Sequence, residues 1–273
     1  MRLTKLGHSC LLVEENGARL LLDPGTLSVG FEELEGLTAV LFTTSTPTTW
    51  TRRGCGGLLD RNPRVRVVND QRSAEPLGQA GVDVEVVADG EELDVGGVAV
   101  GVAGRDHAVI HPDIPVVPNV GYLVGGRLFR PGDAFTLPGQ PVEVLAVPAG
   151  APWLKVSEPI DYLRAVRPRV AVPGHGQVLS AAGRSIHYRQ LEQLSTKGGT
   201  TCGCWRTAPR RSCRRQRADA CSATPAPLRE SGPGPPASLP ATSRAGRAHL
   251  EPHYPQRVRS RESRGPTRIP ARG

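Results

Sequence analysis

Short apolar runs separated by glycine, aspartate and proline fill the first 200 residues, and they restrict the chain to a strand-rich fold. The runs 11–13 and 19–22 flank Glu15-Asn16-Gly17, and an Asn-Gly pair between two apolar runs is a strong hairpin signal. Further strands are expected at 39–43, 65–68, 82–87, 92–95, 98–102, 121–124, 127–129, 142–147 and 169–172.

Three segments predict helices, at 73–79, 157–166 and 185–194. Ser157 is expected to cap the second helix, with Glu158 favourably placed in its first turn. The strands form two groups, and each group is followed by helices. Because a sheet must bury its apolar face against another layer, this order favours an α/β protein built as an αβ/βα sandwich.

The composition changes at about residue 200. Residues 201–273 hold fifteen Arg, no Lys and four acids, so this segment carries a charge of +11. Because the net charge of the whole chain is +8, the first 200 residues carry −3. The segment is also rich in Pro and poor in large aliphatic residues, so it cannot bury enough apolar surface to offset its chain entropy. We therefore predict one domain over residues 1–200 and a disordered Arg- and Pro-rich tail over 201–273.

The cysteines and the N-terminus bear on the compartment. Five of the six Cys lie in the segments 43–57 and 201–273, and Cys10, beside an apolar strand, is expected to be a buried thiol. This usage argues against a disulfide framework. The chain enters a strand directly after Met1 and has no run long enough to span a membrane, so a cytoplasmic location is expected.

Three residues with metal-binding side chains follow predicted strands. His107 comes after the strand 98–102, Asp133 ends Pro131-Gly132-Asp133, and His175 lies in Pro173-Gly174-His175-Gly176. Loops at one edge of a sheet converge because the strands fix where they start. The alternative is that each is an ordinary polar loop or turn residue. His111, beside Pro112, is a rival for the role of His107.

A threonine-rich segment follows the predicted strand 39–43. Residues 43–50 read Thr-Thr-Ser-Thr-Pro-Thr-Thr-Trp. A threonine hydroxyl does not replace imidazole or carboxylate as a ligand of a borderline or hard divalent metal. The segment therefore offers no ordinary metal ligand at this strand end.

Three stretches carry a resemblance to a known family: 107–115 (His-Ala-Val-Ile-His-Pro-Asp-Ile-Pro), Pro131-Gly132-Asp133 and 152–155 (Pro-Trp-Leu-Lys). Over roughly residues 1–200 the chain resembles the metallo-β-lactamase-fold hydrolases, and is most like the branch with the ascorbate-6-phosphate lactonase-like enzymes. The resemblance implies a four-layer αβ/βα sandwich and two metal ions, zinc or manganese. It fails at the family's His-x-His-x-Asp-His motif.

The resemblance also implies roles for single residues. Thr44, Thr46, Thr48 and Thr49 occupy the positions of the motif's ligands. In the family one metal takes the first two motif His and the residue matching His107. The other takes the motif Asp, the motif's last His and the residue matching His175. Asp133 would bridge both metals and belongs to the catalytic centre. His8 and Asp23 match positions that orient ligands or support the loop.

A frame slip is one explanation of the threonine run. If each Thr codon is ACC, reading from the third base gives CAC, which encodes His, and the shifted text permits His-Leu-His-Pro-Asp-His. The hypothesis is one base lost near Thr43 and one gained before Leu58, and the text after Cys202 shifts similarly to a family-like ending. The alternative is a genuine threonine-rich loop.

The sequence therefore predicts a metal-dependent hydrolase in which an activated water attacks a small-molecule ester, lactone or phosphodiester. The missing ligands predict impaired activity in the chain as written. One alternative is a metal-free, non-catalytic domain of the same fold. A second is nucleic-acid binding through the basic tail, but its Cys spacing matches no Cys-x₂-Cys pair and no interleaved aromatic pattern supports base stacking. We expect neither a nucleic-acid nor a membrane partner.

Overall fold

The computed structural model describes residues 1–46 and 52–195. The predictions for Thr48, Thr49 and the tail 201–273 fall outside these residues.

The first sheet contains the first six strands in sequence order. Strands β1 to β3 pair antiparallel, and β3 to β6 continue in parallel. The predicted hairpin is present, with Asn16 and Gly17 at φ of 50° and 85° between β2 and β3. The bounds are β1 Arg2–Leu6, β2 Cys10–Glu15, β3 Ala18–Leu22, β4 Ala39–Leu41, β5 Arg66–Asp70 and β6 Glu85–Val87.

The second sheet has the order β12-β11-β10-β9-β8-β7. Strands β7 to β10 pair antiparallel, whereas β10, β11 and β12 are parallel. The bounds are β7 Glu92–Asp94, β8 Ala99–Ala103, β9 Gly121–Val124, β10 Leu128–Arg130, β11 Val144–Leu145 and β12 Val170–Ala171.

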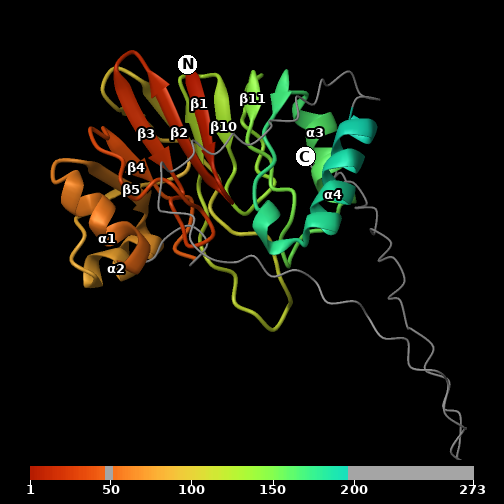
Figure 1. Ribbon diagram of the computed structural model, residues 1–273, viewed down its shortest axis with the longest axis horizontal. Coiled ribbons are helices and arrows are strands. Elements are labelled where there is room, and N and C mark those ends of the chain that lie inside the picture. Colours follow the sequence, from red (N-terminus) through yellow and green to blue (C-terminus); the bar gives the residue numbers. More distant parts are fainter. Residues whose placement is uncertain (47–51, 196–273) are drawn as a thin grey trace, which may run out of the picture. The chain divides into compact units, whose positions relative to one another are not determined.

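Helices cover the outer face of each sheet. Figure 1 shows α1 (Arg52–Arg61) and α2 (Gln71–Gln79) beside the first sheet, and α3 (Ser157–Val166) and α4 (Ala181–Ser195) beside the second. A short 3₁₀ helix, η1 (Gly176–Val178), precedes α4. The expected α/β class and four-layer sandwich are confirmed.

Alternating side chains of the buried strands fill different layers. In β3, Leu20 and Leu22 pack between the two sheets, whereas Leu21 packs toward α1 and α2 with Leu58 and Leu77. This division follows from the two-residue period of a strand, and it explains why β3 is apolar on both faces. A third cluster packs the second sheet against α3 and α4.

Several predicted boundaries were wrong. The helix α3 begins at Ser157, but Val156 is its N-cap residue and no side chain caps it, while Glu158 accepts a hydrogen bond from the Lys155 amide. The helix α2 begins two residues earlier than expected because Asp70 caps it. The helix α4 begins at Ala181 rather than 185, and β6 begins at Glu85 rather than 82.

The predicted burial of Cys10 is confirmed, and neither Cys10 nor Cys55 forms a disulfide within the part of the chain that the structure describes. Cys55, from the segment where we suspect a frame slip, packs in the same core cluster as Cys10. Within residues 1–46 and 52–195, no helix combines the length and the hydrophobicity needed to cross a membrane.

Candidate functional site

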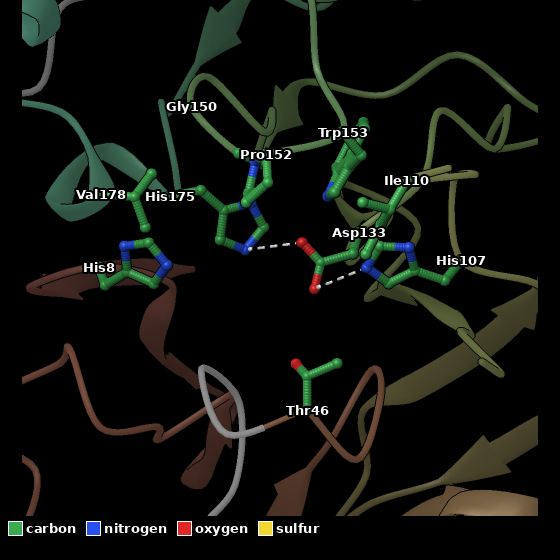
Figure 2. A pocket seen from close by; sticks show the side chains of 11 residues that line it. His8, Thr46, His107, Ile110, Asp133, Gly150, Pro152, Trp153, His175 and Val178 are labelled. Atoms are coloured by element: carbon green, nitrogen blue, oxygen red, sulfur yellow. Dashed lines mark ion pairs between the residues drawn. The ribbon is translucent and has the colours of Figure 1, made fainter. Parts of the chain in front are cut away.

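The predicted strand-end residues border one cavity of about 150 Å³. Figure 2 shows His107 and His175 on either side of Asp133, with Thr46 facing them across the opening. The polar lining comes from His8, Thr46, His107, Asp133 and His175, and the apolar lining includes Ile110, Pro152, Trp153 and Val178.

His107 is held by the loop that follows β8. Its backbone N–H donates to the Val117 carbonyl at 3.0 Å, and the Ala108 N–H donates to the Asp133 carbonyl at 2.9 Å. The ring nitrogen Nδ1 lies 2.5 Å from the Ala108 carbonyl, which can only accept, so Nδ1 carries the proton. The lone pair is therefore on Nε2, which lies 3.8 Å from Asp133 Oδ2.

Asp133 is fixed by the tight turn after β10. Gly132 has φ of 74°, and a Cβ there would come within 2.2 Å of Asn119 Oδ1. That same oxygen accepts the Asp133 N–H at 2.8 Å, while Asn119 Nδ2 donates to the Pro131 carbonyl. Burial raises the pKa of the Asp133 carboxyl, against the opposing effect of His107 and Arg130.

His175 follows β12 in a left-handed backbone conformation, with φ of 57°. Its N–H donates to the His8 carbonyl, and Nε2 lies 3.5 Å from Asp133 Oδ1. Among the described residues Nδ1 is buried and has no hydrogen-bond partner. Burial, and then the nearby Arg130 charge, lower the pKa of His175 well below its ordinary value.

His8 follows β1 and lies against His175, with ring centroids 5.0 Å apart. Its Nδ1 accepts the Gln177 N–H at 3.2 Å. Burial is the main reason that the pKa of His8 falls to about 3, and His175 and Arg130 add to the effect. His8 therefore supports the ring of His175 as a neutral neighbour.

Asp23 and Arg130 form a buried ion pair. The sequence indicated a supporting role for Asp23 but did not indicate Arg130. Arg130 Nε donates to Asp23 Oδ2 at 2.9 Å, and both side chains are almost fully buried. Asp23 also accepts the Thr43 N–H at 2.8 Å and the Thr43 hydroxyl. Asp23 does not line the cavity but holds the loop ends behind it. A charged residue directly after the apolar pair Leu128-Phe129 was the available signal for Arg130, because a buried charge requires a partner.

The opposite side of the cavity carries threonine. Thr46 borders the cavity, and Thr44 is fully buried. Thr48 and Thr49 lie outside the described residues. The rival His111 is exposed, lies 3.5 Å from the Asp113 carboxylate and does not border the cavity.

The donors that the structure describes form only part of a two-metal site. The two imidazoles face different oxygens of Asp133, so this carboxylate lies within reach of both rings. Among residues 1–46 and 52–195, however, no group of three or more His, Cys, Asp or Glu is placed to hold a metal ion. A catalytic zinc usually keeps three protein ligands, so the described set does not fit the metal centre that the fold implies.

Comparisons with known proteins agree with the fold. The family model described as the beta-lactamase superfamily domain matches residues 2–175. Protein Rv0786c of Mycobacterium tuberculosis is 46% identical over 201 residues, which are 72% of this chain and 93% of that protein. The UPF0173 protein PF0020 of Pyrococcus furiosus is 26% identical over 211 residues, 71% of this chain and 91% of that protein.

Solved structures show the same fold. Igni18, a novel metallo hydrolase from Ignicoccus hospitalis, matches with a TM-score of 0.58 and 17% identity, over 74% of this chain and 94% of that one. The metallo-beta-lactamase fold protein YhfI from Bacillus subtilis matches with a TM-score of 0.57 and 11% identity, over 74% and 95%. From the match over residues 2–175 and the shared two-sheet architecture, the chain belongs to the beta-lactamase superfamily domain family and has the metallo-β-lactamase fold.

Proposed function

We propose that this chain derives from a metal-dependent hydrolase of small-molecule esters, lactones or phosphodiesters, and that the chain as written is impaired. In this proposal His107, Asp133 and His175 are the surviving metal ligands. Thr44, Thr46, Thr48 and Thr49 occupy the positions of the lost ones.

One observation carries the proposal. His107 Nε2 and His175 Nε2 each face a different oxygen of the same buried carboxylate, at 3.8 and 3.5 Å. A buried carboxylate with a raised pKa between two imidazoles is costly, so it is more typical of a functional site than of a structural one. The hydroxyl of Thr46 across the cavity is too weak a donor to complete such a site.

The size and lining of the cavity support a small substrate. Its volume is about 150 Å³, and Ile110, Trp153 and Val178 form an apolar part of its lining. Sites for small molecules are typically concave and mostly apolar with a few polar groups. The mixture here suits a compact molecule with one polar reacting group.

The metal-free alternative has one observation in its favour. Arg130 and Asp23 already pair within the buried network, and Arg130 also contacts His175. In such a network the charges of Arg130 and Asp23 offset each other without a metal ion. The nucleic-acid alternative depends on residues 201–273, which lie outside the described residues, and nothing in the structure adds to it.

Metal analysis of the purified full chain tests the proposal. The chain as written should retain less than one equivalent of zinc or manganese after dialysis. A restored chain carries four substitutions at the motif positions: Thr44→His, Thr46→His, Thr48→Asp and Thr49→His. The restored chain should gain partial metal binding, because the donors from both sides of the cavity are then present.

The loop after Thr49 affects how far the restoration goes. Trp50, Arg52 and Arg53 add bulk and positive charge to the segment that carries the lost ligands. Replacing the whole stretch up to Gly57 by its shifted-frame residues should therefore restore metal-dependent hydrolysis in a panel of esters, lactones and phosphodiesters.

Two results would contradict the proposal. Two tightly bound equivalents of metal ion in the chain as written would show that the threonines do not prevent metal binding. A folded chain with the fully restored stretch that takes up no metal would show that His107, Asp133 and His175 are not ligands. Sequencing the gene from the codon of Thr43 to that of Leu58 tests the frame slip separately. A frame slip predicts one additional base near Thr43 and one fewer before Leu58, whereas a genuine threonine-rich loop predicts the codons as written.

A further inference from the structure

A buried arginine contacts the nitrogen of His175 that faces Asp133. Arg130 is fully buried at the end of β10, and its Nη2 lies 3.3 Å from His175 Nε2. We propose that Arg130 takes the place of the metal ion on the His175 side of Asp133 and excludes a dication from that side. This inference rests on the proposed function, because it concerns the same three ligands.

The hydrogen-bonding capacity of the two groups supports this. A guanidinium has only donors and remains protonated in proteins, so at 3.3 Å it must donate to the lone pair of His175 Nε2. The remaining ring proton then resides on Nδ1. Because Nε2 has a single lone pair, it cannot accept from Arg130 and bind a metal ion simultaneously.

Charge acts in the same direction. Arg130 is completely screened from water, so its positive charge acts on its neighbours at a low effective dielectric. A dication placed between His175 and Asp133 would meet this charge at close range. Within residues 1–46 and 52–195, Asp23 is the carboxylate that forms an ion pair with Arg130, and Asp23 does not border the cavity.

Arg130 is held firmly in this position. Its Nε donates to Asp23 Oδ2, and the Thr43 backbone and hydroxyl hold Asp23 from the other side. Gly174 passes so close that a Cβ there would lie 3.0 Å from Arg130 Nη1. If Arg130 moved away to admit a metal ion, it would leave Asp23 as a buried unpaired charge, which is strongly unfavourable.

The His107 side of Asp133 has a different environment. His107 Nδ1 is bound to the Ala108 carbonyl, and the ring packs edge-on against Trp153 with centroids 5.8 Å apart. These contacts leave the Nε2 lone pair directed at Asp133 Oδ2. The two halves of the site are therefore unequal, and restoring the lost ligands should admit one metal ion, on the His107 side.

Three full-length proteins test the inference. The first is the restored chain, with Thr44→His, Thr46→His, Thr48→Asp and Thr49→His. The second adds Arg130→Gln and Asp23→Asn, which remove both charges of the buried pair together. The matched control instead adds Arg127→Gln and Glu143→Gln, which remove a half-exposed pair, 2.8 Å apart, whose residues directly precede β10 and β11. Zinc content after dialysis and titration with Co²⁺, followed by visible absorption, report the number of sites.

The restored chain and the control should each bind about one equivalent. The protein without the Arg130–Asp23 pair should bind two, with the second equivalent at least about 100-fold tighter than in the control. Two tight equivalents in the restored chain would overturn this inference alone, as would an unchanged stoichiometry after removal of the pair. No uptake in any of the three folded proteins would count against the ligand assignment as well.

A measurement on the chain as written avoids any risk that the variants fail to fold. The ring nitrogens of His175 should give the ¹⁵N NMR pattern of a neutral imidazole with its proton on Nδ1. The Arg127→Gln and Glu143→Gln protein should give the same pattern. A proton on Nε2 of His175 would overturn the inference, because that nitrogen could not then accept from Arg130.

Discussion

The two sides of the cavity differ in how completely they are built. On one side, backbone hydrogen bonds and a left-handed glycine hold His107, Asp133 and His175 in place. On the other side, Thr44 and Thr46 follow β4 and carry hydroxyl groups at positions where we propose that stronger ligands were lost. The hydrogen bonds of the first side use the backbone and Asn119, and none of them needs a metal ligand from Thr44 or Thr46.

This difference shows that the residues that hold the loops of a site in place can be distinct from the residues that would bind a metal ion. Thr43, at the start of the threonine run, still binds Asp23 through its backbone and its hydroxyl. The contact ties the end of β4 to the buried Arg130 pair. Residues that hold the loops in place therefore remain even where no described residue supplies a metal ligand on that side.

The largest expected effect comes from breaking the Arg130–Asp23 pair in the chain as written. Arg130→Met should lower the free energy of unfolding by about 3–5 kcal/mol, because it leaves Asp23 buried without its counter-charge. Urea denaturation followed by circular dichroism measures this.

The double variant with Asp23→Asn should recover much of the loss, because no unpaired buried charge remains. Arg127→Met, in a more exposed ion pair with Glu143, should cost no more than about 1 kcal/mol. Equal losses for Arg130→Met and Arg127→Met would contradict the role of burial.

A smaller effect is expected at the turn before Asp133. Gly132→Ala should cost about 2–3 kcal/mol, because a Cβ would meet Asn119 Oδ1 at 2.2 Å and the Thr43 Cβ at 2.7 Å. Gly139 has nearly the same φ, 72°, and its Cβ would meet nothing within 4 Å. Gly139→Ala therefore measures the backbone cost alone, about 1 kcal/mol. If the two variants melt at the same temperature, the close approach of Gly132 to Asn119 and Thr43 does not contribute to the free energy of unfolding.

The pH dependence of stability should be smaller still. The pKa of His8 is about 3 in the folded chain and the pKa of His175 is also lowered, whereas both are near 6.5 when unfolded. The unfolded chain therefore takes up protons first, so stability is full above pH 6.5 and is lost as the pH falls toward 3. Between pH 7 and pH 5 the His8 contribution should be about 1 kcal/mol after solvent screening.

The raised pKa of Asp133 acts in the opposite direction, so the test is a difference between two proteins. Denaturation curves of the unaltered chain and of His8→Gln should converge as the pH falls from 7 to 5. Parallel curves over this range would mean that His8 is not held neutral in the fold.

The smallest expected effect concerns the rival histidine. His111 is exposed and does not border the cavity, so His111→Ala should change stability by less than about 0.5 kcal/mol. In the restored chain, His111→Ala should leave zinc uptake unchanged, whereas His107→Ala should abolish it. Loss of uptake in the His111 variant alone would reverse the assignment.

Much of the fold could be predicted from local patterns. The Asn16-Gly17 turn fixed the first hairpin, and apolar runs of strand length located most strands, because side-chain alternation and turn chemistry are local properties. Boundaries were less predictable. Asp70 extends α2 toward the N-terminus because its side chain accepts hydrogen bonds from two backbone N–H groups. The apolar pattern alone does not show whether such a cap or the helix propensity of the next residues decides where the helix begins.

The site could be predicted only in part. The strand-end positions of His107, Asp133 and His175 were visible in the sequence, since each follows an apolar run and a turn. Arg130 was not identified, because nothing near it in the sequence reveals its partners. Asp23 precedes it by 107 positions and lies after β3 of the other sheet, whereas His175 follows it by 45 and lies after β12 of the same sheet. Only the tertiary structure brings the three residues together.

The sequence by itself determined the two strand groups, the turns that end the strands and the identity of the residues at those ends. These properties follow from side-chain period and backbone preference over a few residues. The tertiary structure alone decided that His107 and His175 face different oxygens of Asp133 and that a buried arginine reaches His175. Those contacts depend on the strand order of the second sheet, because β8, β10 and β12 lead to these residues, and that order pairs strands that lie far apart in the chain.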